Sequence, residues 1–378
     1  MSGLPFGTFE TPDDGIAVNG SVAFTGWALD DIGVESVKIY RKDGTTLVDV
    51  GDACFIDGAR PDVWQVYPDF PNSFRAGWGY LYVTNCLADG TYEFHAKAKD
   101  VEGNEVTLGT KSITILNAMA VKPFGDIVTP QPCSTVSGSN YKIEGWVATQ
   151  PPKIVNKVEV FVDSVNLGEA ALTPGGTPAP PCPIPDYRSF DYDLNTVGYS
   201  NGLHTLYCKA TDSDGKSNDF GHRYFSIHNI GSINSISQMA ASTPAYRPIS
   251  DIEKVPVDSV KLFIVKGDSR KNVMPRGIRP DRTGHIYIQI EEMERIEVQL
   301  NAAPGTSKYT GYHVIGNYLM PLPVGSTLDK ERGIFYWLPG PGFMGSYQMV
   351  FIEEKPNKEM TKKFVNVKIV PKFMKGEK

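Results

Sequence analysis

The residue types that most often carry out catalysis are scattered along this chain rather than gathered in motifs. No two of the six histidines stand four positions apart, no HExxH zinc motif occurs, and no GxSxG, P-loop or GxGxxG segment is present. Gly267-Asp268-Ser269 resembles the nucleophile block of some esterases, but it lies between two expected strands, with no helix after it. We therefore expect no catalytic residue and no cofactor. The histidines are His95, His204, His222, His228, His285 and His313.

An acidic segment from Asp212 to Asn218 has part of the composition of a calcium loop. Calcium needs six or more oxygen ligands and a late bidentate carboxylate, which this segment lacks at the required distance. The aligned stretch from Asp100 to Asn104 and this segment both suit hairpin turns, in which Asp bonds its own backbone and Gly takes a positive φ. We expect turns and no metal site, with a calcium ion held by Asp30 or Asp31 at a domain junction as the open alternative.

A loop rich in aromatic residues and proline is the one candidate binding region. Such a loop can form a contact surface for a carbohydrate or a protein, or it can fold back over the end of its own domain, which is the interpretation we favour. Trp27 and Trp146, by contrast, occupy equivalent repeat positions on alternating strands, which predicts core packing. The candidate contact residues are Arg60, Asp62, Trp64, Tyr67, Phe70, Phe74 and Trp78.

Five cysteines are present and none forms a CxxC pair, which excludes zinc ribbons and thioredoxin-type sites. Cys54 and Cys86 fall in one repeat, and Cys133 and Cys182 in the next. We treat each pair as a candidate disulfide; the first would pin the aromatic loop and add roughly 3–4 kcal/mol in the chain-entropy model. Cys208 aligns with Ala96 at an inward position, so we expect a buried thiol there.

The elements that must position these residues are strands in repeated units. Segments such as 34–40 and 91–98 alternate apolar and polar residues with period two, and no long amphipathic helix is evident. Two units of about 115 residues share a pattern, which is the size of a sandwich of about seven strands. Matching blocks are Pro5-Phe6-Gly7 with Pro123-Phe124-Gly125, Gly26-Trp27 with Gly145-Trp146, and Asp100 with Asp212.

Residues 231–257 are rich in Ser, Ala and Pro without a clear period, which predicts a linker, although a strand that packs on a neighbour is an alternative. Further strands follow to the end of the chain. We therefore predict an all-β protein with three β-sandwich domains in tandem: residues 1–117, 118–230 and, after the linker, 258–378.

Composition narrows the possible partners. The net charge is −6 and the isoelectric point about 5.6, which argues against a general nucleic-acid binder. The lysine-rich end, from Lys355 onward, reads as a solvated edge strand and tail. No run of 18 apolar residues occurs, so we expect no membrane insertion. The chain begins without a signal peptide, which suggests a processed or trimmed chain.

A family resemblance supports this organisation. Residues 5–117 and 123–229 resemble bacterial tandem Ig-like repeats of large secreted or surface proteins, on "GWALDDIGVESVKIY" and "LADGTYEFHAKAKDVEGN" in the first repeat and "PFGDIVTP" and "NGLHTLYCKATDSDGKSN" in the second. Residues 321–352 are similar to the Ig- or cadherin-like type of bacterial surface proteins. The second repeat departs in its middle, where Thr177–Cys182 replaces Arg60-Pro61-Asp62. The resemblance implies an extracellular or cell-surface location and a scaffolding or adhesive role, without naming a ligand.

These observations favour a non-enzymatic, adhesion-type structural and interaction module, built as a short rod of three sandwiches. Its expected partner is a protein or carbohydrate surface, or a second copy of the chain. One alternative is a subunit of an extracellular fibre that assembles by strand addition, with residues 231–257 as the exchanged segment. Another is the accessory tail of a secreted hydrolase.

Overall fold

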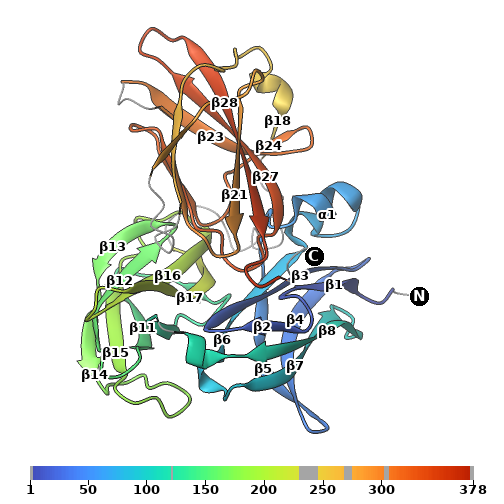
Figure 1. Ribbon diagram of the computed structural model, residues 1–378. Helices are drawn as coiled ribbons and strands as arrows, with labels where there is room; N and C mark the ends of the chain where they lie inside the picture. The colour runs from blue at the N-terminus through green and yellow to red at the C-terminus, as the bar shows by residue number, and fades with distance from the viewer. Residues whose placement is uncertain (1–2, 121, 230–245, 268–274, 302–305, 375–378) are drawn as a thin grey trace.

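The computed structural model describes residues 3–120, 122–229, 246–267, 275–301 and 306–374. Strands dominate all these parts of the chain, and they form three sandwiches (Figure 1). The predicted all-β fold with tandem Ig-like sandwiches is confirmed. Among the described residues, no helix has the length and apolar character needed to cross a membrane.

The first sandwich has the strand order β1-β3-β6-β5-β4-β7-β8-β2, in which β5 pairs with both β4 and β6 and so joins the two faces. Its core lies between them, around Phe24, Trp78 and Phe94. Its elements are β1 (Phe6–Thr11), β2 (Ile16–Val18), β3 (Ser21–Leu29), β4 (Val34–Asp43), β5 (Thr46–Phe55), α1 (Pro61–Val66), η1 (Ser73–Arg75), β6 (Gly77–Val83), η2 (Thr84–Cys86), β7 (Gly90–Asp100), β8 (Glu105–Ile115) and η3 (Asn117–Met119).

The second sandwich has one sheet in the order β10-β17-β16-β12-β13 and another in the order β14-β15-β11-β9. Its own core contains Phe190, Phe220 and Phe225. Its strands are β9 (Phe124–Thr129), β10 (Thr135–Val136), β11 (Tyr141–Ala148), β12 (Val155–Val162), β13 (Val165–Glu169), β14 (Ala171–Pro174), β15 (Arg188–Leu194), β16 (Gly202–Asp212) and β17 (Ser217–Ile227).

The third sandwich packs a six-stranded sheet, β18-β24-β23-β27-β28-β21, against a five-stranded sheet, β20-β19-β22-β26-β25. Its elements are β18 (Arg247–Pro248), η5 (Ile249–Ile252), β19 (Phe263–Lys266), β20 (Arg276–Ile278), β21 (His285–Glu291), β22 (Ile296–Gln299), β23 (Lys308–Ile315), β24 (Tyr318–Met320), β25 (Ser326–Asp329), β26 (Ile334–Trp337), β27 (Gly345–Glu354) and β28 (Met360–Val370).

Two expectations about the last third of the chain are wrong. Residues 246–257 are not a linker, because β18 pairs with β24 and Ile252 is buried against the third sandwich. Residues 231–245 of the expected linker lie outside the described residues. The lysine-rich end is not an edge strand either. β28 lies between β27 and β21, and Lys363 on it is 1% exposed.

The repeated Gly-Trp pair shows why the two repeats form the same sandwich. A Cβ atom on Gly26 would lie 1.9 Å from the Thr8 carbonyl oxygen, and one on Gly145 would lie 2.3 Å from the Asp126 carbonyl oxygen. Neighbouring strands approach so closely here that only glycine fits. The glycine at each position lets the first strand of its repeat pair closely with the third strand. These strands are β1 and β3 in the first repeat and β9 and β11 in the second.

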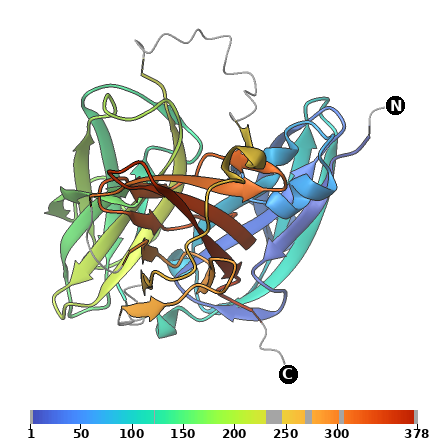
Figure 2. The same cartoon turned by 90° about the horizontal axis from the view of Figure 1, so that it is seen from above.

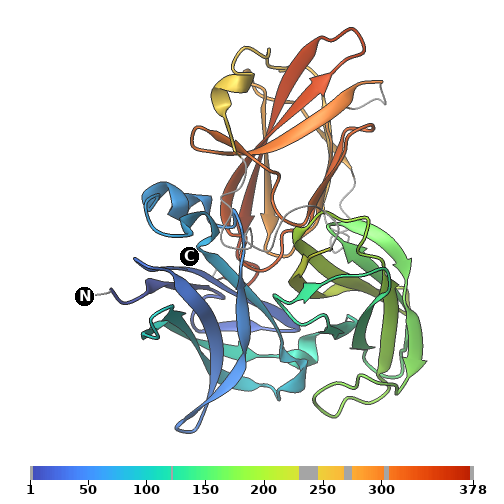
Figure 3. The same ribbon diagram turned by 180° about the vertical axis from the view of Figure 1, so that it is seen from behind.

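The three sandwiches cluster instead of forming the expected rod. The third sandwich lies across the first two, which sit side by side (Figures 1 and 3). From above, it covers the region between them (Figure 2). The chain end also returns to the first sandwich, where Phe373 packs against the core that contains Phe24 and Trp78. The cause of this arrangement lies in the contacts at the junction.

Candidate functional site

The Arg60–Trp78 segment connects β5 to β6 and forms α1 and η1 on the way. Pro61 occupies the first turn of α1, where its missing N–H costs nothing. Arg60 is 8% exposed and holds the segment down through Glu10 (Nη1–Oε2 2.6 Å) and Asp62 (Nη2–Oδ2 2.6 Å). Burial opposes ionisation of Asp62, but the hydrogen bond and charge of Arg60 outweigh it and lower the pKa of Asp62.

Most aromatic side chains of this segment pack inward. Tyr67 and Phe70 make edge contacts with Phe6, and Tyr67 also contacts Trp27. Trp78 is fully buried in the core of the first sandwich and is therefore no contact residue. The segment folds back over the end of its own sandwich, as we favoured, and Arg60, Tyr67, Phe70 and Trp78 serve that packing.

Trp64 and Phe74 take a different direction and reach the other two sandwiches. They line a cavity of about 190 Å3 that Leu203 of the second sandwich and Leu322 of the third complete. His313 also lines it, and burial lowers the pKa of His313 to about 4, so the ring is neutral near neutral pH. This cavity marks the point where all three sandwiches meet.

A short loop of the third sandwich, residues 339–344, fills the junction beside this cavity. The Tyr224 hydroxyl of the second sandwich donates to the Pro341 carbonyl (3.1 Å), and the Tyr347 hydroxyl donates to the Ala59 carbonyl of the first. A Cβ on Gly79 would lie 2.1 Å from the Pro341 carbonyl oxygen, so the loop seats directly on the bare backbone of β6. One apolar core thus continues from the third sandwich into the first two.

The two disulfides also cross the junction, and the expected pairs are wrong. Cys54 is bonded to Cys133 (Cα–Cα 5.7 Å) and Cys86 to Cys182 (Cα–Cα 5.4 Å), so both join the first sandwich to the second. Cys54 pairs in register with Gly79, and β6 runs on to Val83 before Cys86 is reached. That run carries the chain about 13 Å away, beyond the roughly 7 Å that a bridge tolerates between Cα atoms.

A further opening lies between α1 of the first sandwich and the outer face of the six-stranded sheet of the third. It has a volume of about 590 Å3 and is lined by Pro61 and Gln65 from α1. From the sheet come Tyr287, which is 66% exposed, and neutral side-chain amides. We call this opening the α1 cleft. Its amides belong to Gln289, Gln348 and Asn366, and Lys368 is the charged side chain among its lining residues.

One feature of the sequence indicated the α1 cleft, and we missed it. In β21, Ile286, Ile288 and Ile290 face the core, so Tyr287 and Gln289 must face outward. Tyr287 and Gln289 therefore place an aromatic ring and an amide on the same outward face of β21. Nothing in the sequence indicated that α1 lies close to this sheet, because that proximity depends on how the first sandwich docks on the third.

In two places in the described parts of the chain a histidine contacts a carboxylate, which supplies two of the three members of a catalytic triad, but neither pair is arranged to activate a nucleophile. His204 contacts Asp163 through Nδ1, yet its Nε2 is bonded to the Ser200 carbonyl (2.8 Å) and so has no access to a nucleophile. His95 lies between Glu93 (2.9 Å) and Thr110 (3.1 Å) on the paired strands β7 and β8, outside the openings described above. Both pairs therefore stabilise strands and turns.

The remaining predicted residues that the structure describes lie in turns or in buried positions of the sandwiches. Asp100 and Asp212 each accept backbone N–H groups two and four residues ahead, which is the expected turn. Asp30 accepts the N–H groups of Ile32 and Gly33, another turn. Trp146 and Cys208 are buried, and Cys208 is a free thiol. Asp268 and Ser269 of the esterase-like segment lie outside the described residues.

No protein-family model matches the chain, and no curated protein matches it. Among solved structures, it is similar to the fibronectin(III)-like modules of Clostridium thermocellum CbhA, at 15% identity over 61% of this chain and 97% of that chain (TM-score 0.21). It is also similar to the N-terminal eight Ig domains of Down Syndrome Cell Adhesion Molecule, at 9% identity over 98% and 41% (TM-score 0.24). A third is Bacteroides ovatus SGBP-B in complex with a mixed-linkage heptasaccharide, at 10% identity over 98% and 71% (TM-score 0.20). Likenesses this low carry no argument about function.

Proposed function

We propose that this chain is a non-enzymatic extracellular interaction module that binds a carbohydrate chain in the α1 cleft. The cleft's lining is the observation that carries the proposal. Sugars present hydroxyl groups together with apolar C–H faces, so they match side-chain amides beside an exposed aromatic ring. Tyr287 supplies that ring, and Gln289 and Gln348 supply amides on the same sheet face.

The contacts within the cleft also support preorganised binding. Asn366 donates to the Ile286 carbonyl (3.1 Å) and accepts from Gln348 (3.2 Å), so these two amides are already oriented. The opposite wall is α1, which Arg60 ties to the first sandwich. A cleft whose two walls belong to different sandwiches works only if those sandwiches keep their positions, which the junction loop favours.

The extracellular location is supported by the cysteines. Two disulfides that close separations of 79 and 96 residues are typical of proteins that fold in an oxidising compartment. The fibre alternative has less support. Of the segment proposed for exchange between subunits, the described part, residues 246–257, already pairs and packs within its own chain.

Affinity electrophoresis of the full chain through gels that contain soluble polysaccharides tests this proposal. We expect retardation by at least one neutral polysaccharide and its loss in Tyr287→Ala. The matched control is Tyr318→Ala, because Tyr318 is 42% exposed in the same sandwich but does not line the cleft. Retardation by none of a broad panel, or equal loss in both variants, contradicts the proposal, and concentration-dependent mass in light scattering points to self-association instead.

A further inference from the structure

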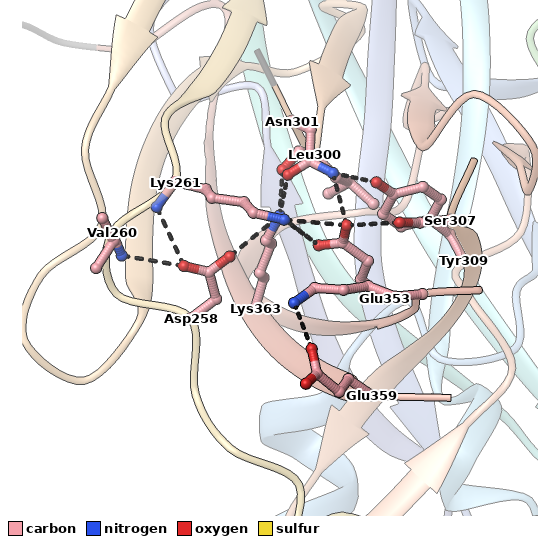
Figure 4. Close-up of polar contacts among 11 residues, drawn as sticks. Asp258, Val260, Lys261, Leu300, Asn301, Ser307, Tyr309, Glu353, Glu359 and Lys363 are labelled. Carbon is pink, nitrogen blue, oxygen red and sulfur yellow. Dashed lines mark hydrogen bonds and ion pairs between the residues drawn. The ribbon is translucent and has the colours of Figure 1, made fainter. Parts of the chain in front are cut away.

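The core of the third sandwich contains an unusual group of polar side chains (Figure 4). In β28, Lys363 has the same parity as Val365 and Val367, and all three are buried. In β27, Glu353 has the same parity as Tyr347, Met349 and Phe351, which are also buried. A lysine and a glutamate therefore occupy positions where the strand pattern places apolar residues. A charge in such a place is costly, which calls for a reason.

Asn301 completes the group. It directly follows Leu300 at the end of β22, in the opposite sheet, and its side chain reaches towards Lys363 and Glu353 (Figure 4). Lys363 Nζ lies 2.5 Å from Asn301 Oδ1 and 3.3 Å from Glu353 Oε2. Asn301 Nδ2 lies 3.1 Å from Glu353 Oε1. One carboxylate therefore contacts both the amine and the amide nitrogen.

We propose that Lys363 and Asn301 form an intramolecular isopeptide bond, with Glu353 as the catalytic residue. The Lys363 amine attacks the Asn301 amide carbon Cγ, and a new C–N bond joins Nζ to Cγ. Glu353 accepts the proton that the amine loses and passes it to Asn301 Nδ2, whose bond to Cγ breaks. Ammonia leaves, so a primary amine and a primary amide become one secondary amide, and no oxidant or other reactant is needed.

The geometry suits this reaction. Cγ lies one carbonyl bond, about 1.2 Å, beyond Oδ1, which places it within about 3.7 Å of Nζ, near the separation of reacting atoms in an attack-ready conformer. The Phe263 ring lies 5.7 Å from Nζ, and Tyr309, which is 4% exposed, contacts Asn301. Such surroundings exclude the water that would compete with the amine.

The charges agree with these roles. Burial lowers the pKa of Lys363, which makes the free amine easier to form. Burial acts in the opposite sense on Glu353, but the hydrogen bond from Lys261 and the charge of Lys363 outweigh it and lower the pKa of Glu353 to about 2. Glu353 is therefore ionised before the reaction, as a proton acceptor must be. The product replaces a buried amine with a neutral amide.

Such a bond would have a clear structural effect. Asn301 and Lys363 are 62 positions apart and belong to opposite sheets, so the bond would close the third sandwich covalently. Both disulfides join the first two sandwiches, and the third has no cysteine. The isopeptide bond would give the third sandwich the covalent clip that the disulfides give to its neighbours.

Mass spectrometry of the full chain, unfolded, reduced and alkylated, tests the inference. We expect an intact mass lower by one ammonia than the mass of the sequence with its five cysteines alkylated. Trypsin should release peptide 296–308 joined to peptide 363–368, because the modified Lys363 no longer permits cleavage after it. Lys355→Ala, which removes a partly exposed lysine near the group, should keep both signatures.

The outcomes separate clearly. Glu353→Gln and Asn301→Ala should show the full mass and no joined peptide. Joined peptide in Glu353→Gln would refute the role of Glu353. The full mass in the unaltered chain, with peptides 296–308 and 364–368 recovered separately, would overturn the inference and leave a non-covalent polar group. That measurement needs no variant to fold, and it is independent of carbohydrate binding.

Discussion

The first and second repeats share one sandwich plan, yet only the first offers the third sandwich a bare strand. Gly26 faces Trp78 across β3 and β6, and Gly145 faces Phe190 across β11 and β15. The residue after each aromatic ring differs: it is Gly79 in the first repeat and Asp191 in the second. Pro341 seats on Gly79, whereas Asp191 lies on the surface with Lys142 (2.8 Å). The contact of Pro341 with the first repeat thus uses a position without a side chain, which the shared fold alone does not supply.

The middle segments of the two repeats also have different roles in the contacts between sandwiches. In the first repeat this segment forms α1, which walls the α1 cleft, and sends Trp64 and Phe74 to the junction. In the second it is a proline-rich loop that carries Cys182, which bonds to Cys86 of the first repeat. In the first repeat the middle segment therefore forms one wall of a cleft, and in the second it forms a covalent link to the first repeat.

The largest expected effect comes from removing one bridge between the repeats. Cys54→Ser with Cys133→Ser should lower the free energy of unfolding by roughly 4 kcal/mol, because a long loop is released in the unfolded chain. Cys86→Ser with Cys182→Ser should cost somewhat less, since Cys54 is also packed in the junction core, at 5% exposure. Denaturant unfolding of both double variants measures this. A larger loss for the second pair would contradict the ranking.

The next effect concerns pH at the contact of the first repeat with the third sandwich. Glu292 is 3% exposed and accepts from Thr11 (3.2 Å), and burial raises the pKa of Glu292 to about 8. A raised carboxyl pKa means that stability present below about pH 4.5 is lost as the pH rises towards 8, by about 1.4 kcal/mol per pH unit. Glu292→Gln, which mimics the protonated group, should therefore stabilise the protein at pH 7 by about 3 kcal/mol.

Thermal unfolding from acid to alkaline pH measures that slope. The variant should show a flatter dependence than the unaltered protein, and the two should converge at low pH. Glu253→Gln is the control, because Glu253 is an exposed side chain of the same sandwich. Parallel curves for Glu292→Gln and the unaltered protein would show that Glu292 is ionised in the folded state.

A side chain at Gly79 tests the comparison of the repeats directly. Gly79→Ala should cost about 2 kcal/mol, since its Cβ would overlap the Pro341 carbonyl and the backbone offers no relief. Asp191→Ala, at the equivalent position of the second repeat, should change stability by less than about 0.5 kcal/mol. Small-angle scattering should also show that the third sandwich detaches in Gly79→Ala. Equal stability of Gly79→Ala and Asp191→Ala would show that the third sandwich does not need a bare backbone at Gly79 for its docking.

The parts of this molecule that follow period-two alternation were predictable, and the contacts between sandwiches were not. The expected strand 34–40 lies within β4, because its alternating pattern leaves one arrangement that buries Val37 and Ile39. The predicted cysteine pairs were wrong because we considered each repeat alone, whereas both disulfides join one repeat to the other. Residues 246–257 failed because they have little alternation and dock through a few side chains such as Ile252.

The candidate site also has a part that could be predicted from the sequence and a part that depends on contacts between sandwiches. The aromatic enrichment of the Arg60–Trp78 segment was readable, but which rings turn inward depends on Phe6 and Trp27, and which reach the junction depends on the third sandwich. Strand parity could have placed Lys363 and Glu353 inward, but we read the lysine-rich end as solvated. Their partner Asn301 could not be placed in this way, because the parity of β27 and β28 does not specify which residue of the opposite sheet lies across from them.

The smallest effect concerns the second repeat at its own contact with the third sandwich. The turn of Asp163 and Ser164 joins β12 to β13, and Ser164 donates to the Gly325 carbonyl (2.9 Å). His204 holds this turn through Asp163. Burial lowers the pKa of His204, but the hydrogen bond and charge of Asp163 outweigh it, so the pKa is raised overall. The stabilisation is therefore complete below about pH 6.5 and is lost as the pH rises through the folded pKa.

His204→Gln should consequently lower the melting temperature most in mild acid and less as the medium becomes alkaline. His204→Gln should destabilise the protein, whereas Glu292→Gln should stabilise it. In the unaltered protein, both contacts weaken as the pH rises. His95→Gln serves as the control, because His95 pairs with Glu93 on β7, away from the third sandwich. A loss of equal size at every pH would mean that His204 acts through its shape and neutral hydrogen bonds. In that case only the first repeat would link proton binding to the position of the third sandwich.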